Sequence, residues 1–320
     1  MVSLRRYTAS DAPQWDRFVE DSKNGTFLFL RGYMDYHSDR FTDHSLMFYD
    51  EKQRLIALLP ANEKDGILYS HQGLTYGGLV ISTKSRAAEV LEIFTSAKAY
   101  LKENGFKEWY YKQMPTCYHQ CPSEEDEYAL WRSGAKLENC LISTTIPLNG
   151  CTIYPEIERR RKRGVAKAEE AGYTIKESTD YEQFWRIMEA NLMDRYSLKP
   201  VHTLQEMLLL HSRFPKNIRL FLVTKDGKAE GGCVVYVANN TCIHIQYGHA
   251  TPQGKQDGVL DLLYTTLMDE FRKEGYRYMD FGNSNEQGGK YLNENLIAQK
   301  EGFGGRGTVY KMWHININEG

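Results

Sequence analysis

The sequence predicts an α+β protein with mixed sheets, formed by tandem duplication of one unit. The second half of the chain shows the pattern most clearly. It begins with three runs rich in β-branched and aromatic residues, which are separated by Lys-Asp-Gly and Asn-Asn turns. A helix, a short strand, a second helix and a last strand are expected to follow. The predicted ranges are strands at 218–224, 231–238 and 242–249, a helix at 257–275, a strand at 276–282, a helix at 291–302 and a strand at 306–315.

The first half repeats this order of elements. Its predicted ranges are strands at 45–50, 54–61 and 66–80, a helix at 85–105, a strand at 106–114, a helix at 125–135 and a strand at 138–148. Two segments also match directly: "LKENGFKEWYYK" pairs with "FRKEGYRYMDFG", and "LWRSGAKLENC" pairs with "AQKEGFGGRGT". Both pairs are separated by about 170 residues, and agreement between two anchors indicates a true repeat. We therefore expect two domains, 1–150 and 151–320.

Length and composition describe an ordinary globular protein. A chain of 320 residues exceeds what one hydrophobic core usually serves, and 41% hydrophobic with 26% charged residues is typical of soluble domains. The net charge of −2 predicts no general attraction to nucleic acid or acidic membranes. The sequence shows no signal peptide and no apolar run long enough for membrane insertion. We expect a cytoplasmic protein, with its oligomeric state left open.

The six cysteines indicate buried thiols and not a disulfide framework, given their scattered positions in a long chain. "CYHQC" places Cys117, His119 and Cys121 close together, but no second cluster completes a tetrahedral site. We therefore expect no metal.

A basic segment joins the two halves. "PEIERRRKRGVAKAEEAG" (155–172) has five consecutive cations at 159–163. Such a run occurs in nucleic-acid patches, but the near-zero net charge favours a linker helix with a solvated basic face. Beside an interdomain groove, this helix could still attract an anionic ligand.

Several segments of the second half carry a family resemblance: "PVHTLQEMLLL", "FPKNIRLFLV", "HIQYGHA" and "YMDFGNSNEQGGKYLNENLIAQKEGFGGR". Together with the repeated element order, they resemble the doubled GNAT acyltransferase fold of the bacterial FemABX-like transferases. The resemblance is strong over 200–306 and mainly architectural before 150. It implies two GNAT-like domains, with the first structural or shaping the substrate cleft and the second holding the active site.

The resemblance also implies a donor site. GNAT enzymes bind the acyl-CoA pyrophosphate where the fourth strand meets the third helix, here "TPQGKQDGVLDLL". The candidate cofactor-binding residues are Gln253, Gly254, Lys255 and Gly258. Their spacing departs from the family pattern, and Asp257 would repel phosphate. In FemABX-like enzymes the donor is aminoacyl-tRNA, for which a degenerate CoA loop is expected.

Acyl transfer to an amine needs a base, a stabilised oxyanion and an acid, without a covalent enzyme intermediate. The predicted catalytic residues are Asp280, His244 and Tyr247. Strand alternation places His244 and Gln246 on one face and Tyr247 on the other. Asp280, at a strand end, would abstract a proton or recognise the amine. A hydrogen-bonded structural role remains the alternative for each strand histidine.

The remaining candidates are polar residues expected to bind substrate. They are Lys199, His202, Gln246, Asn283, Ser284, Glu286, Asn293, Lys300 and Arg306. Structural alternatives are open for several of them, because Asn293 or Ser284 could cap a helix and Thr203 with Glu206 forms a capping box.

"QKEGFGGRG" (299–307) contains both structural and candidate functional residues. By correspondence with Gly134, Gly302 is expected to end a helix and Phe303 to enter the core. Four residues have no counterpart in the first repeat and are predicted to form a cleft wall for an anion: Lys300, Gly304, Gly305 and Arg306. Many GNAT enzymes have a tyrosine general acid where this chain has Ala298. Three alternatives follow: another residue such as Tyr291 or Tyr247 protonates the leaving group, the leaving group needs no acid, or the site is no longer catalytic.

The favoured function is transfer of an acyl group, acetyl above all, from acyl-CoA to an amine of a small or peptide-like acceptor. Two alternatives remain. One is FemABX-like transfer from aminoacyl-tRNA to a peptidoglycan precursor, the only case in which tRNA is a partner. The other is a non-catalytic binding protein of the same fold.

Overall fold

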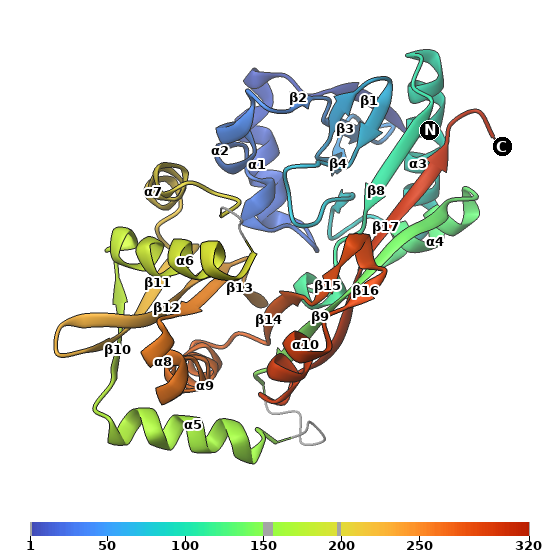
Figure 1. The fold of residues 1–320 in the computed structure, drawn as a ribbon. Helices are drawn as coiled ribbons and strands as arrows, with labels where there is room; N and C mark the ends of the chain where they lie inside the picture. The colour runs from blue at the N-terminus through green and yellow to red at the C-terminus, as the bar shows by residue number, and fades with distance from the viewer. Residues whose placement is uncertain (1, 150–155, 197–199, 320) are drawn as a thin grey trace. The chain divides into compact units, whose positions relative to one another are not determined.

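A computed structural model describes residues 2–149, 156–196 and 200–319 (Figure 1). The chain divides into two units. Unit 1 comprises Met1–Ile142, Asn285–Tyr291 and Thr308–Gly320, and unit 2 comprises Ser143–Ser284 and Leu292–Gly307. Each unit therefore contains segments from both halves of the sequence.

Unit 1 contains most of the first half. Its elements are β1 (Ser3–Arg6), α1 (Ala12–Asp21), α2 (Arg31–Met34), β2 (Thr42–Asp43), β3 (Leu46–Tyr49), β4 (Leu55–Leu59), β5 (Asn62–Lys64), β6 (Ile67–Tyr69), β7 (Val80–Ile81), α3 (Ala87–Glu103), β8 (Glu108–Lys112), α4 (Glu125–Arg132) and β15 (Asn285–Glu286). Strands β9 (Lys136–Pro147), β16 (Tyr291–Leu292) and β17 (Arg306–Asn316) have residues in both units.

The core of unit 1 forms around α3. This helix presents Val90, Ile93, Phe94, Ala97 and Leu101 at three-to-four spacing, and all five are buried. They pack in one cluster with residues of β3, β4 and β8. Burial of a side chain such as Leu101 contributes about 1.5–3 kcal/mol.

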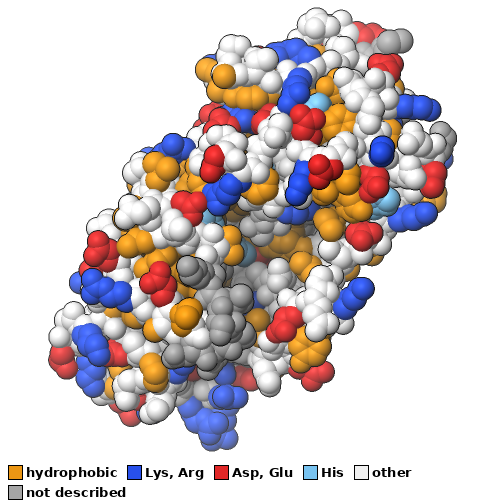
Figure 2. Space-filling view, turned by 45° about the horizontal axis from the view of Figure 1, so that its top comes forward, with side chains coloured by type: hydrophobic (Ala, Val, Ile, Leu, Met, Phe, Trp, Pro, Cys, Tyr) orange, Lys and Arg blue, Asp and Glu red, His pale blue; other side chains and the backbone are white. Residues whose placement is uncertain are grey.

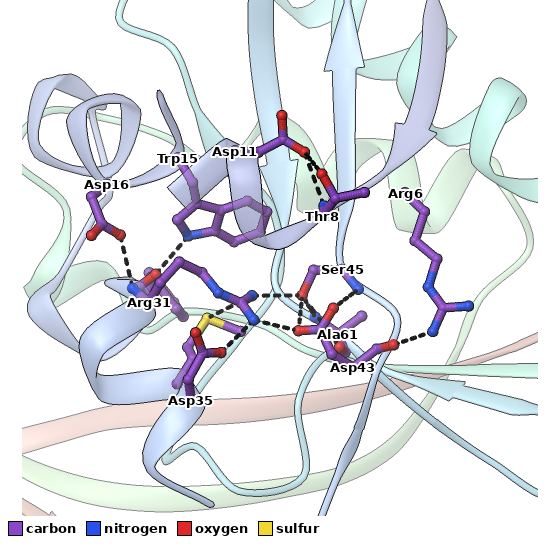
Figure 3. Close-up of polar contacts among 12 residues, drawn as sticks. Arg6, Thr8, Asp11, Trp15, Asp16, Arg31, Asp35, Asp43, Ser45 and Ala61 are labelled. Atoms are coloured by element: carbon purple, nitrogen blue, oxygen red, sulfur yellow. Dashed lines mark hydrogen bonds and ion pairs between the residues drawn. The ribbon is translucent and has the colours of Figure 1, made fainter. Parts of the chain in front are cut away.

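A buried arginine organises the N-terminal part of unit 1 (Figure 3). The Arg31 guanidinium pairs with Asp35 at 2.5 Å and Asp43 at 2.8 Å, and it lies 3.8 Å from the ring centre of Tyr7. The backbone N–H of Arg31 donates to Asp16 Oδ1 at 2.8 Å. These contacts join α1, α2 and β2. Breaking them is costly, because removing one partner of such a network leaves a buried charge.

Unit 2 contains most of the second half. Its elements are α5 (Arg159–Glu170), β10 (Thr174–Ser178), α6 (Tyr181–Tyr196), α7 (Leu204–Arg213), β11 (Ile218–Lys225), β12 (Lys228–Val237), β13 (Cys242–Ala250), α8 (Pro252–Asp257), α9 (Val259–Lys273), β14 (Tyr278–Asn283) and α10 (Glu294–Glu301).

The sheet of unit 2 has the order β10-β11-β12-β13-β14-β9. Helix α9 packs against β12 and β13, and α6 also contacts both of these strands (Figure 1). The apolar stripe of α9 and the alternating apolar residues of β11, β12 and β13 form one buried cluster, which Phe281 and Phe303 complete. The burial of Phe303, next to the C-cap Gly302, confirms the structural interpretation of "EGFG".

The predicted strands at 218–224, 231–238 and 242–249 and the helices at 85–105, 125–135 and 257–275 are confirmed to within a few residues. The strand predicted at 66–80 is wrong in its middle, where only Ile67–Tyr69 and Val80–Ile81 are strands. Between them, the ammonium of Lys112 binds the carbonyl oxygens of residues 71, 72 and 74. The loop is therefore held by a side chain and not by a sheet.

The last strands of the two repeats are exchanged. Tyr278 of β14 pairs with Pro147 of β9, within unit 2. Met312 of β17 pairs with Lys112 of β8, within unit 1. The predicted boundary near 150 assigns each strand to its own half, whereas the contacts assign the end of β9 to unit 2 and residues 308–316 to unit 1. The predicted division into 1–150 and 151–320 remains a proposal about evolutionary repeats.

The structure also bears on the cysteines, on metal binding and on membrane-spanning helices. Cys117, Cys233 and Cys242 are buried free thiols as expected, but Cys121 and Cys140 are exposed; the sixth, Cys151, lies outside the described residues. In the described ranges no cluster of three His, Cys, Asp or Glu side chains could hold a metal ion. No helix in the described part of the chain has the length and apolarity needed to cross a membrane.

Candidate active site

A pocket opens in unit 2 where two parallel strands separate. Strands β13 and β14 pair only at Cys242–Tyr278, Ile243–Met279 and His244–Asp280. Beyond these pairs the strands diverge, and a pocket of about 780 Å³ occupies the gap, lined by residues 245–250 of β13 and by Phe281 of β14. The other walls come from α5, α6, α9 and α10.

A β-bulge shapes the pocket side of β13. Val235 of β12 pairs with Ile245, but the adjacent Val234 pairs with Tyr247, so Gln246 is an extra residue in the strand. A bulge leaves backbone groups outside the ladder and inverts the facing of the residues that follow. Ile245 belongs to the α9-facing core, whereas the Tyr247 ring contacts Trp185 of α6.

The bulge corrects one expectation from strand alternation. Alternation places Tyr247 opposite to His244 and Gln246. In the structure Gln246 and Tyr247 line the same pocket, and the inversion brings Tyr247 to the α6 side of the strand, which His244 also faces. The prediction failed because simple alternation takes no account of an inserted residue.

The predicted catalytic residues His244 and Asp280 form a buried pair at the point of divergence. His244 Nδ1 lies 2.8 Å from Asp280 Oδ2, and the Asp280 side chain is fully buried. The Ser143 hydroxyl donates to Asp280 Oδ1, and Thr145 donates to the same oxygen at 3.3 Å. An ionised carboxylate only accepts, so Asp280 holds the Nδ1 proton of His244 and leaves Nε2 as the basic ring atom. Asp280 itself is too enclosed to receive a substrate.

Tyr247 carries a phenol that is held in place at the pocket wall. Its hydroxyl lies 2.6 Å from Nδ1 of His202 and accepts the backbone N–H of that residue at 3.3 Å. The structure thus brings the predicted residues Tyr247 and His202 together. His202 is buried behind the tyrosine, so it can orient this hydroxyl without itself lining the pocket.

Lys300 places a cation at the end of β14. Its ammonium donates to the carbonyl oxygens of Gly282 and Asn283, each at 2.8 Å, and its side chain lines the pocket. Burial lowers the pKa of Lys300 to about 8, against the opposing charge of Asp280. Because an ammonium has three N–H groups, two contacts leave one donor for a ligand.

The predicted CoA site is largely covered by α5. A Cβ added at Gly258 would lie 2.5 Å from the Gly164 carbonyl oxygen, so the backbone of α5 touches the start of α9. Arg161 donates to Asp261 in the first turn of α9 at 2.6 Å, and Lys167 donates to the Gln256 carbonyl at 2.7 Å. Residues of α5 therefore occupy part of this helix start, although Lys255, Gly258 and Asp261 still line the pocket.

Three of the four candidate cofactor-binding residues lie on α8 and Gly258 is its C-cap, and the four have different surroundings. Lys255 and Gly258 line the pocket, with Lys255 donating to the side-chain oxygen of Asn191. Gly254 is buried against the Glu230 carbonyl, and Gln253 is exposed and donates to Asp257 at 2.8 Å. Asp257 also pairs with Lys167 at 3.2 Å, so its charge is compensated within the protein.

The other predicted binding residues mostly lie outside the pocket. Asn293 caps α10 by accepting the Leu296 N–H at 3.0 Å, and the predicted Thr203–Glu206 capping box is confirmed. Asn283 and Arg306 are exposed, Ser284 is buried, and none of them lines the pocket. Glu286 and the alternative acid Tyr291 belong to unit 1, and Lys199 lies outside the described residues.

Sequence reasoning missed several pocket residues. Asn191 comes from α6, and Arg160 and Arg161 come from α5. Arg161 was predicted only as part of a solvated basic face, but its side chain is mostly buried against Asp261. The remaining cations of the run are exposed, and Figure 2 shows a group of Lys and Arg side chains at its lower edge, where α5 lies in Figure 1.

Comparison with known proteins identifies the fold. Residues 156–291 match the family model of an acetyltransferase (GNAT) domain. FemX is similar in structure, with 13% identity, a TM-score of 0.70 and coverage of 99% of this chain and 98% of that chain. L-PGS from Bacillus licheniformis has 14% identity, a TM-score of 0.63 and coverage of 96% and 92%. No curated protein matches the sequence.

A third structure supports the duplication. The tandem GNAT protein from the clavulanic acid biosynthesis pathway covers 100% of both chains, with 12% identity and a TM-score of 0.51. The protein therefore has a doubled GNAT fold. The residues that match the GNAT model lie in the second half of the chain, and the fold as a whole is similar to that of FemX.

Proposed function

We propose that the protein is an N-acyltransferase that transfers an aminoacyl group from aminoacyl-tRNA to an amine of a peptide-like acceptor. The observation that carries the transferase assignment is the pocket between the diverging strands, whose lining begins at Ile245 and Phe281, the residues that follow the His244–Asp280 pair in the sequence. This arrangement supplies a base beside a site enclosed enough to hold an acyl group.

In this mechanism the acceptor amine attacks the ester carbonyl carbon of the donor. His244 Nε2 takes the proton of the amine while Asp280 holds the ring. Backbone N–H groups at the Gln246 bulge and the Lys300 ammonium stabilise the oxyanion. The carbon–oxygen ester bond then breaks, and Tyr247 protonates the departing ribose oxygen. The proton held by His244 is released to solvent and Tyr247 takes one proton back from solvent, so both groups return to their starting states and the reaction is balanced.

The choice of donor rests on α5. An acyl-CoA donor in a GNAT site needs its pyrophosphate at the start of α9, where Gly164 and Arg161 of α5 now lie. Exposed cations on α5 and Arg160 at the pocket wall would suit a larger polyanion. The resemblance to FemABX-like enzymes supports the same donor and implies a peptidoglycan precursor as acceptor. Another similar structure is the C-terminal domain of a putative lysylphosphatidylglycerol synthetase from Agrobacterium fabrum, whose name also describes an aminoacyl product.

Acyl-CoA remains the second candidate donor, because Lys255 and Gly258 do line the pocket. The experiment that separates the two is a donor screen with the full chain. Radiolabelled aminoacyl-tRNA and acetyl-CoA are each incubated with the protein and a peptide amine, and transfer to the amine is measured. We expect transfer from aminoacyl-tRNA alone. Acceptor-dependent release of CoA would instead establish the second candidate, and turnover with neither donor would leave a non-catalytic binding protein.

A further inference from the structure

The pocket contains a buried hydrogen-bond acceptor with no donor. Gln246 is the residue that the bulge adds to β13, and it lines the pocket. Its side-chain oxygen Oε1 is fully buried, and no described residue donates to it. Buried polar atoms are nearly always hydrogen-bonded, so an orphan at a pocket wall indicates a bond that a ligand completes.

The pocket lysines do not supply this donor. Lys255 is directed to the side-chain oxygen of Asn191, and Lys300 is directed to the carbonyl oxygens of Gly282 and Asn283. The ligand group that reaches Gln246 must therefore carry an N–H or O–H of its own.

We propose, on the basis of the function proposed above, that Gln246 Oε1 accepts a hydrogen bond from the α-amino group of the transferred aminoacyl residue. In an aminoacyl ester the α-nitrogen is only two bonds from the reacting carbonyl carbon. Gln246 would thus contact both groups of the donor, with its backbone N–H at the carbonyl oxygen and its side chain at the amine. Acetyl and propionyl groups carry hydrogen in place of the α-amino group and leave Oε1 unsatisfied, so the pocket selects aminoacyl donors.

The test compares matched donors on one RNA microhelix. Alanyl and propionyl groups differ only in the α-amino group, as do glycyl and acetyl groups. Transfer to a peptide amine is measured as kcat/KM for wild type, Gln246→Met and Gln246→Glu. The control is Gln205→Met, an exposed position on α7 in the same unit. Thermal unfolding of each variant shows that it is folded.

We expect wild type to prefer the aminoacyl donor by about 10- to 100-fold, the range for a buried acceptor left unpaired. Gln246→Met should reduce this preference to about threefold or less. Gln246→Glu, which keeps an acceptor, should retain it, and Gln205→Met should match wild type. Equal use of alanyl and propionyl donors by wild type would overturn the inference while leaving aminoacyltransferase activity intact. Loss of the preference in Gln246→Glu would also overturn it, by showing that the amide donates. Absence of transfer from every donor would overturn both proposals.

Discussion

Replacement of Asp280 by asparagine tests the catalytic pair directly. The carboxylate accepts from Ser143 and Thr145 through one oxygen and from His244 Nδ1 through the other. Asparagine keeps one carbonyl oxygen but presents an NH₂ group in place of the second acceptor. If that NH₂ faces His244, Nδ1 must become the acceptor, and the ring proton then moves to Nε2. The ring nitrogen that takes the substrate proton is thereby blocked.

The expected loss follows from this change of tautomer. General-base catalysis contributes about 10²–10⁴-fold, and a wrong histidine tautomer removes essentially all of it. The hydrogen bonds from Ser143 and Thr145 can persist, so the free energy of unfolding should fall by only about 1–3 kcal/mol. We therefore expect Asp280→Asn to lower the single-turnover transfer rate by about 10³-fold while the protein remains folded.

The assay is single-turnover transfer from saturating donor, together with urea unfolding. Asp269→Asn is the matched control, because Asp269 is an exposed residue of α9 that pairs with Arg272 in the adjacent turn. It should transfer at the wild-type rate. A rate for Asp280→Asn within about threefold of wild type would refute the role of the pair, because loss of a general base lowers the rate by at least about 10²-fold.

Three further predictions concern stability and pH. Gly258→Ala should lower the free energy of unfolding by about 2–4 kcal/mol, because φ is +79° and the added Cβ meets the Gly164 backbone. Gly227→Ala, at φ +76° but in open space, should lower it by about 1–2 kcal/mol. Equal losses for the two variants in urea unfolding would contradict the contact between α5 and α9. Transfer should fall as pH rises through about 8, where Lys300 loses its proton, and Lys300→Arg should shift this fall upward; identical pH profiles would exclude the ammonium from the reaction. Burial lowers the pKa of His71 to about 3, so stability present above pH 6.5 should be lost as pH falls, by about 2–3 kcal/mol at pH 4.5. Asparagine tolerates the left-handed φ of +58°, so His71→Asn should lose less free energy of unfolding than wild type when the pH is lowered. An equal loss in the variant would show that other groups cause the acid destabilisation.

Much of the fold was predictable because its signals are local. The α9 stripe at Leu263, Leu267 and Phe271 has helical spacing, and Gly275 ends the helix with φ of +93°. The three strands before it are separated by turn residues. The same order in both halves indicated the duplication, and the resemblance of the second half predicted a site there, where the candidate pocket also lies.

The candidate site was predictable in part of its membership but not in its geometry. His244, Asp280, Tyr247, His202 and Lys300 were all identified from their strand-end or loop positions. Whether two of them touch depends on the pairing of β13 with β14, which local sequence patterns do not determine. Gln246 was identified as a polar strand residue, but its unpaired carbonyl depends on a bulge.

The sequence by itself determined the repeating elements, the helix ends and the residues that could carry acyl-transfer chemistry, because helix and strand periodicity and capping act over a few residues. Only the tertiary structure decided that β9 and β17 are exchanged, that the bulge turns Tyr247 to the side of His244, and that α5 lies against the start of α9. Each of these depends on contacts between segments far apart in the chain. The free energy of such contacts comes from packing and pairing that no short window of residues contains.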